Sequence, residues 1–150
     1  MANDFWSFID NNLANKPAVL ALKAAACYSG LTSPVPDEIV VYVESRIPEL
    51  NNIKSENFKI KQIKISSLDK IEYTTDKYGV KCSSAEQIVY DILKRSYRSW
   101  IKYGIWIIGY DYFRIVDDYF LVIDDTFSKF KLPPRYKKIL DKHIQKINSY

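Results

Sequence analysis

The sequence predicts an α+β fold: N-terminal helices, a small central and mainly antiparallel sheet, and C-terminal helices. Apolar residues recur at helical spacing towards both ends of the 150-residue chain. Its middle contains short runs of β-branched residues bounded by turn residues. Because helices and strands are segregated rather than alternating, we expect an α+β arrangement and not a doubly wound sheet. The length is that of one domain, spanning 1–150.

The first thirty residues are predicted to form two helices. The segment 4–13 is amphipathic, and Asn3 or Asp4 is its expected N-cap. Pro17 suits the first position of a second helix, which continues to Cys27 and is apolar nearly all round. This second helix should therefore be buried.

The central segment is predicted to hold the strands. After Gly30, a natural helix stop, a turn with prolines leads into a strand over 39–43. A second strand is expected over 58–65, with a bulge where the apolar alternation slips. The runs 71–75 and 80–82 are expected to form a hairpin closed by 76–79.

The remainder is predicted to be helical, including the whole C-terminal part 111–150. Ser83 or Ser84 caps a helix whose apolar face excludes Asp91 and Lys94. Between Phe113 and Phe130, apolar residues are then spaced alternately three and four positions apart, which is the pattern of a helical seam. A last helix starts at Pro133, whereas 104–116 fits a strand or a buried helix.

Composition and charge narrow the class of protein. No apolar run is long enough to cross a membrane and no signal peptide is recognisable, so we expect a cytoplasmic protein without a membrane partner. Cys27 and Cys82 stand alone in the sequence and are expected to be buried, reduced thiols. The net charge is +4, but residues 57–82 alone sum to +3.

No catalytic or cofactor-binding pattern is recognisable, so we expect a non-enzymatic protein without a cofactor or metal. The lone histidine, His143, is interpreted as a surface or packing residue. Cys and His are too few for a zinc site, and the glycines form no phosphate-binding loop. A solvated helix face explains the acidic group better than metal binding does: Asp117, Asp118, Asp124 and Asp125.

One pattern is similar to that of metal-dependent nucleases. Pro36-Asp37 followed by Glu44-Ser45-Arg46 approximates two metal-binding carboxylates and an assisting base. The short spacing leaves little room for a turn between paired strands. Arg46 also stands where lysine is usual, and arginine does not readily lose its proton. A nuclease using Asp37 and Glu44 is therefore the weakest alternative.

A basic segment follows the acidic one near the C-terminus. It could bind a protein partner, or contact the phosphate groups of a nucleic acid. Basic terminal helices are, however, common in proteins that bind no nucleic acid. Its candidate binding residues are Lys129, Lys131, Arg135, Lys137, Lys138, Lys142 and Lys146.

Residues 17–95 resemble the C-terminal domain of abortive-infection (AbiEi-like) type IV antitoxins, which also act as transcriptional regulators. The resemblance rests on a small-residue helix ending in Gly30-Leu31, a proline loop and strand, the segment Gly79-Val-Lys-Cys82, and the helix start Ser84-Ala-Glu86-Gln-Ile-Val-Tyr-Asp91. Gln87 replaces a threonine of the family pattern. The motif positions are Gly30, Pro36, Gly79, Ser84, Glu86 and Asp91, and each also has a simple structural explanation.

The resemblance implies an interaction protein for antiviral defence within a toxin–antitoxin system. Its expected partner is a protein, with a nucleotidyltransferase-like toxin as the candidate. Family members usually carry an N-terminal winged helix that binds DNA, and about 16 residues precede the matching region here. We therefore expect a stand-alone effector domain without operator recognition of its own. Nucleic-acid binding through the basic tail is the alternative.

Overall fold

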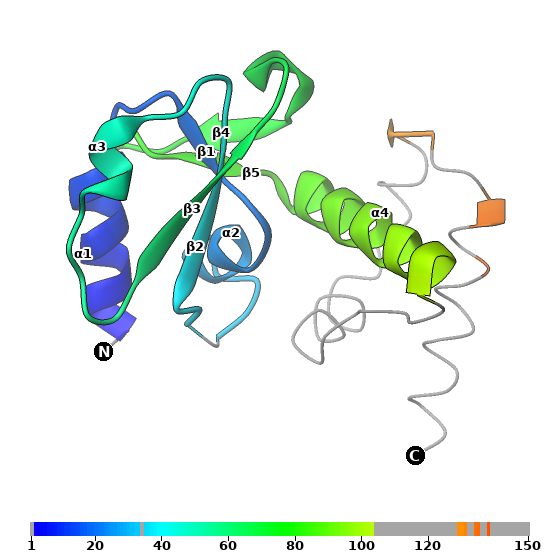
Figure 1. Ribbon diagram of the computed structural model, residues 1–150, viewed down its shortest axis with the longest axis horizontal. Helices are drawn as coiled ribbons and strands as arrows, with labels where there is room; N and C mark the ends of the chain where they lie inside the picture. The colour runs from blue at the N-terminus through cyan, green and yellow to red at the C-terminus, as the bar shows by residue number, and fades with distance from the viewer. Residues whose placement is uncertain (1, 34, 104–128, 132–133, 136–137, 139–150) are drawn as a thin grey trace. The chain divides into compact units, whose positions relative to one another are not determined.

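The computed structural model describes residues 2–33, 35–103, 129–131, 134–135 and 138. Helices and strands confirm the expected α+β class (Figure 1). In chain order they are α1 Ala2–Leu13, β1 Ala18–Leu20, α2 Leu22–Tyr28, β2 Glu38–Val43, α3 Pro48–Asn51, β3 Lys59–Lys64, the 3-10 helix η1 Leu68–Lys70, β4 Tyr73–Thr75, β5 Lys81–Ser83 and α4 Ala85–Tyr103. The chain divides into two compact units, Met1–Ile88 and Val89–Tyr150, and the expected single domain stays a prediction.

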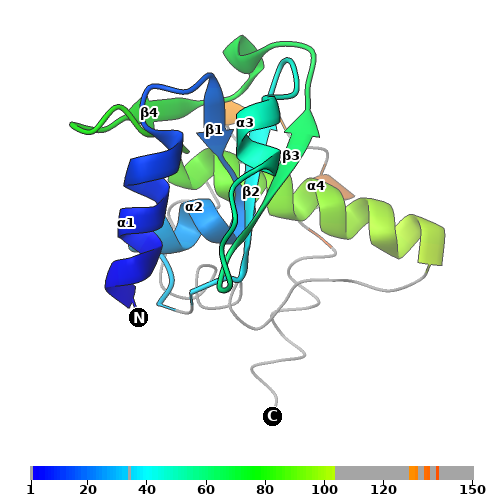
Figure 2. The same cartoon turned by 60° about the vertical axis from the view of Figure 1, so that its left-hand side comes forward.

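The five strands form one mixed sheet in the order β3-β2-β1-β5-β4. β1 is antiparallel to β2 and parallel to β5, while β2 is parallel to β3 and β4 is antiparallel to β5. Two of the four pairings are thus parallel, and the expected mainly antiparallel sheet was wrong in this respect. Figure 2 shows β1, β2 and β3 in succession, with β3 as the outermost of the three.

The N-terminal helix was correctly predicted, but its start was not. α1 begins at Ala2, so Asn3 and Asp4 lie inside its first turn instead of capping it. Phe5, Ile9 and Leu13 recur every four residues and are all buried, which is the pattern of a helix packed along one side.

The expected second helix is divided into a strand and a shorter helix. Ala18–Leu20 forms the central strand β1, which pairs with β2 on one side and β5 on the other. Leu22 has a positive φ of 54°, which turns the chain sharply into α2. Pairing to distant segments therefore outweighed the local helix preference of these alanines and leucines.

The core lies around β1 and β2. All of β1 and five of the six β2 residues are buried, so side chains on both faces of these strands are covered. α2 packs against β2 and β5, with Ala24, Ala25 and Ala26 fully buried. Their small side chains permit the close approach of helix and sheet.

A hydroxyl group links α1, α2 and the β4–β5 turn. The Tyr28 hydroxyl contacts Oδ1 of Asp10 at 2.8 Å and also contacts Oδ2 of Asp76. Burial, followed by the hydrogen bonds to Asp76 and Asp10, raises the pKa of Tyr28. Burial acts to raise the pKa of Asp76, but the hydrogen bonds from Tyr28, Val80 N–H and Tyr78 N–H lower it overall. Trp6 Nε1 adds a bond to the Tyr28 carbonyl at 3.2 Å.

α4 carries the expected apolar face with one correction. Ile88, Val89, Ile92 and Leu93 are buried as predicted. Asp91, expected outside this face, is also buried, with 7% of its surface exposed. Within the second unit, Tyr90 stacks on Phe130 with ring centroids 4.8 Å apart.

Several C-terminal expectations lie outside the described residues. They include the seam between Phe113 and Phe127 and the segment 104–116. Residues 134–135 and 138 are helical, in agreement with a last helix starting near Pro133. Among the helices that are described, none combines the length and apolar character needed to cross a membrane.

Candidate interface at the sheet edge

The family-motif glycines have conformational roles. Gly30 follows the last turn of α2 with φ of +83°, its N–H donates to Cys27, and the next N–H, of Leu31, donates to Ala26. These two bonds form a Schellman motif, which ends a helix. Gly79 has the same φ in the β4–β5 turn, and its carbonyl accepts from Asn15 N–H at 2.9 Å.

The other motif residues occupy helix and loop positions. Ser84 caps α4, since its hydroxyl oxygen accepts from Gln87 N–H at 3.1 Å. Glu86 lies in the first turn of α4, where its negative charge interacts favourably with the positive end of the helix dipole. Pro36 is half-buried in the loop before β2, and Asp91 is buried in α4. For Gly30, Gly79 and Ser84 these contacts are structural, and no ligand need be invoked.

The nuclease pattern was wrong for Asp37 and Glu44. They flank β2 at opposite ends, and an extended strand rises about 3.3 Å per residue, which separates them by roughly 20 Å. Two carboxylates that share one metal ion must both lie within about 2.6 Å of it. Glu44 instead accepts a hydrogen bond from Leu68 N–H at 2.7 Å. Among the described side chains, no three His, Cys, Asp or Glu residues gather as metal ligands.

Both cysteines are buried and free, as expected. Burial raises the pKa of Cys27. Burial and the charge of Asp76 raise the pKa of Cys82 to about 12. Both thiols are therefore protonated near neutral pH, whereas a nucleophilic cysteine needs its thiolate form.

Four of the seven candidate basic residues of the tail are described, and all four are exposed. They are Lys129, Lys131, Arg135 and Lys138. Lys137, Lys142 and Lys146 lie outside the described residues, as do His143 and the Asp117–Asp125 group. Whether the tail forms one continuous basic face stays a prediction.

Among the strands of the described residues, β3 presents a long open edge of the sheet. Lys59 and Ile65 donate their N–H groups to Asp37 and Val43, so the odd-numbered residues bond towards β2. By alternation, the N–H and C=O groups of Ile60, Gln62 and Lys64 face away from β2. Within the described chain β3 has a strand on one side only. β4, at the opposite edge, has three residues against six in β3.

Lysine side chains flank this open edge on both faces of the sheet. Lys59 and Lys61 project to one face and Lys64 to the other, and all three are exposed. The sequence does show the relevant signal, a lysine-rich Lys-Ile-Lys-Gln-Ile-Lys run in the +3 segment 57–82. The expected position of the strand was correct, but its place at the edge was not inferred.

Gln62 explains why no bulge is needed in β3. Pairing with β2 continues in register from Lys59 to Lys64. Gln62 lies on the same face as Ile60, and its side-chain amide bonds both backbone groups of Ile47, accepting at 2.7 Å and donating at 2.9 Å. The slip in the apolar pattern therefore marks a glutamine that holds the β2–β3 connection, and the predicted bulge was wrong.

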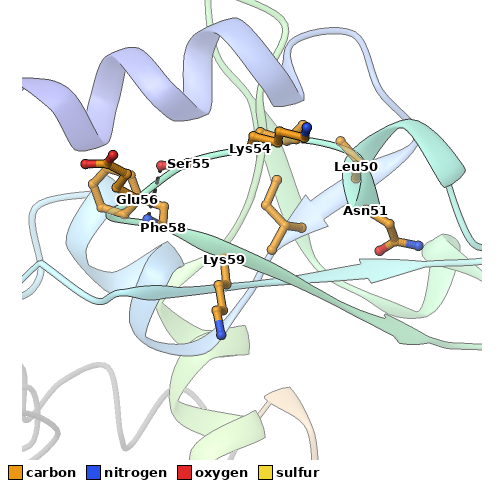
Figure 3. Close-up of a pocket in the computed structure, with 9 residues that line it drawn as sticks. Leu50, Asn51, Lys54, Ser55, Glu56, Phe58 and Lys59 are labelled. Atoms are coloured by element: carbon orange, nitrogen blue, oxygen red, sulfur yellow. Dashed lines mark hydrogen bonds between the residues drawn. The ribbon is translucent and has the colours of Figure 1, made fainter.

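A pocket opens beside the beginning of β3. Its volume is about 640 Å³, and it lies between α3, the following loop and the first residues of β3 (Figure 3). Its lining is mixed: the apolar side chains are Leu50, Ile53, Phe58 and Ile60, and the polar or charged ones are Asn51, Lys54, Ser55, Glu56 and Lys59. Figure 3 shows Lys59 pointing away from Leu50 and Lys54.

Two contacts fix the walls of this pocket. Phe58 packs between Phe5 and Phe8 of α1, with ring centroids 6.0 and 5.1 Å away. On the other side, Lys16 bonds Glu49 of α3 at 2.5 Å, and this contact lowers the pKa of Glu49. We name the open edge of β3, its three lysines and the pocket together the β3 edge site.

The chain matches no protein-family model, and no curated protein matches it.

Proposed function

We propose that this chain is a non-enzymatic interaction protein, similar in role to a stand-alone antitoxin effector domain, that binds a protein partner. The open six-residue edge of β3 is the observation that carries the proposal. A free strand edge offers a row of backbone donors and acceptors that an added segment can pair with. The candidate partner is a nucleotidyltransferase-like toxin.

The composition of the edge favours a partner other than a second copy of this chain. Two β3 strands placed side by side would gather two sets of Lys59, Lys61 and Lys64 along one shared edge. Like charges directly opposite one another destabilise a strand pair, and edge lysines commonly prevent self-association. Such an edge stays available for a different protein.

Co-expression with a nucleotidyltransferase-like toxin encoded beside this chain tests the proposed function. We expect the chain to restore growth of cells that express the toxin and to co-elute with it in size-exclusion chromatography. A catalytically inactive toxin serves as the control for growth and should still co-elute. Toxicity that persists at excess chain, together with separate elution of the two proteins, contradicts the proposal.

Nucleic-acid binding by the basic tail is a second candidate. Lys129, Lys131, Arg135 and Lys138 are all exposed, which supports phosphate contacts. Fluorescence anisotropy with a labelled duplex at low and high salt tests it. Charge reversal at Lys137 and Lys138 should weaken binding and reduce its salt dependence. Absence of binding at low salt removes this candidate.

A further inference from the structure

We infer that the β3 edge site accepts an extended, acidic segment of the partner as an added strand, and that an apolar side chain of this segment enters the adjoining pocket. The inference rests on the proposed function and states which chemistry the partner must offer. It follows from three features of the site: the direction of its backbone groups, the charge of its rim and the lining of its pocket.

The backbone of β3 is ready to form a second ladder. Ile60, Gln62 and Lys64 direct their N–H and C=O groups away from β2, and the register of β2 with β3 is regular over the whole strand. A segment of about six residues covers the roughly 20 Å length of β3. Backbone pairing of this kind gives affinity without requiring a particular sequence.

The charge of the edge selects an acidic segment. A neighbouring strand lies about 4.8 Å away, which brings its side chains within reach of the lysines on the same face. Carboxylates opposite Lys59 and Lys61 are attracted, whereas lysines or arginines there are repelled. Such pairs decide which partner is accepted and speed its approach more than they add affinity.

The pocket adds a second requirement. The apolar part of its mixed lining is formed by Leu50, Ile53, Phe58 and Ile60, beside the charged side chains of Lys54 and Glu56. Ile60 projects to the face opposite Lys59 and Lys61, because adjacent strand residues alternate. A partner strand with acidic side chains on one face therefore carries its apolar side chains on the pocket face. The site thus fits a segment in which acidic and apolar residues alternate.

A capped peptide of about eight residues, alternating glutamate and valine, is the probe. Titrated into the ¹⁵N-labelled full chain, it should shift the amide signals of β3 and protect the amides of Ile60, Gln62 and Lys64 from hydrogen exchange. A lysine–valine peptide of the same length tests the charge preference. A version methylated at the amide nitrogens that face β3 tests backbone pairing, and both control peptides should bind at least about tenfold more weakly.

Substitutions in the protein provide the matched comparison. Lys59→Glu with Lys61→Glu should weaken binding of the glutamate–valine peptide by about tenfold. Lys70→Glu with Lys77→Glu makes the same change in net charge at exposed positions away from β3 and should leave the affinity within about twofold. If the β3 variant fails to fold, the comparison of the methylated and unmethylated peptides still tests the inference, because it uses the protein with no residue changed.

Equal binding of the methylated and unmethylated peptides, or shifts confined to the basic tail, overturns the inference. So does self-association of the chain through β3, seen as concentration-dependent sedimentation that the Lys59→Glu, Lys61→Glu variant alters. The proposed function fails separately: if the chain binds the toxin but this variant binds it equally well, the edge inference is wrong and the proposed function stands.

Discussion

Replacing Gly79 by alanine tests the contact between the β4–β5 turn and the connection from α1 to β1. A Cβ atom at this position would lie 2.3 Å from Asn15 Oδ1 and 3.2 Å from Asn15 N. Asn15 itself has a positive φ of 60° and donates its N–H to the Gly79 carbonyl. The two turns are therefore in direct contact, and Asn15 must move if Gly79 gains a methyl group.

Two effects contribute to the expected loss of stability. A left-handed conformation costs a residue with a Cβ about 1–2 kcal/mol. Displacing Asn15 adds a further loss of about 1–3 kcal/mol, as is usual when a packed contact receives an extra methyl group. We expect Gly79→Ala to lower the free energy of unfolding by about 2–5 kcal/mol in total.

Gly30→Ala is the matched control. Gly30 has the same φ of +83°, but no atom that its Cβ would meet lies within 4 Å. Gly30→Ala should therefore lower the free energy of unfolding only by the cost of the left-handed backbone, about 1–2 kcal/mol. The decrease in unfolded-chain entropy that alanine brings is common to both variants and cancels in their difference.

Urea unfolding followed by circular dichroism measures both variants. A double variant, Asn15→Gly with Gly79→Ala, should recover most of the crowding loss, because the asparagine side chain is removed while glycine still adopts a positive φ. Equal losses for Gly79→Ala and Gly30→Ala would refute the reasoning, as would a double variant that recovers nothing.

Three further predictions concern other contacts. The raised pKa of Tyr28 means that the folded chain keeps the phenol proton above about pH 10, where the unfolded chain loses it, so stability should fall as pH rises through this range. Tyr28→Phe should reduce this alkaline loss, measured as urea midpoints at about pH 8 and about pH 11, and an unchanged loss contradicts the role of Tyr28. Gln62→Ala removes both bonds to Ile47 and should cost about 1–3 kcal/mol, whereas Lys61→Ala, at an exposed neighbouring position, should change the unfolding midpoint little. Cys27 and Cys82 should react with a thiol reagent at neutral pH only after unfolding, and fast labelling of the native chain would contradict their burial.

Local patterns were sufficient to predict much of the first unit. The hairpin of β4 and β5 forms where predicted, because the turn residues 76–79 and the flanking β-branched residues act over a few positions. The start of α4 was predicted for the same reason, since the Ser84 cap and the apolar spacing after it are local signals.

Features set by distant pairing could not be read from the sequence. Ala18–Leu20 begins an alanine- and leucine-rich run to Cys27 that is typical of a helix, and its pairing with segments far along the chain makes it a strand. The order of the strands is also invisible locally, so the lysine-rich run of β3 could be recognised as a strand but not as an open edge. Asp91 shows a further limit, because it was expected outside the apolar face of its helix and is nevertheless buried, which the local spacing does not predict.

The position of β1 has a consequence for synthesis of the chain on the ribosome. This early strand needs β5, more than sixty residues later, to complete its second side, and Ser83 Oγ bonds the Leu20 carbonyl at 2.7 Å when β5 arrives. Until Lys81 and Cys82 have left the exit tunnel, a nascent chain holds β1 with one side unpaired. Translation pauses before this point should therefore prolong exposure of an apolar strand edge and increase the demand for chaperones.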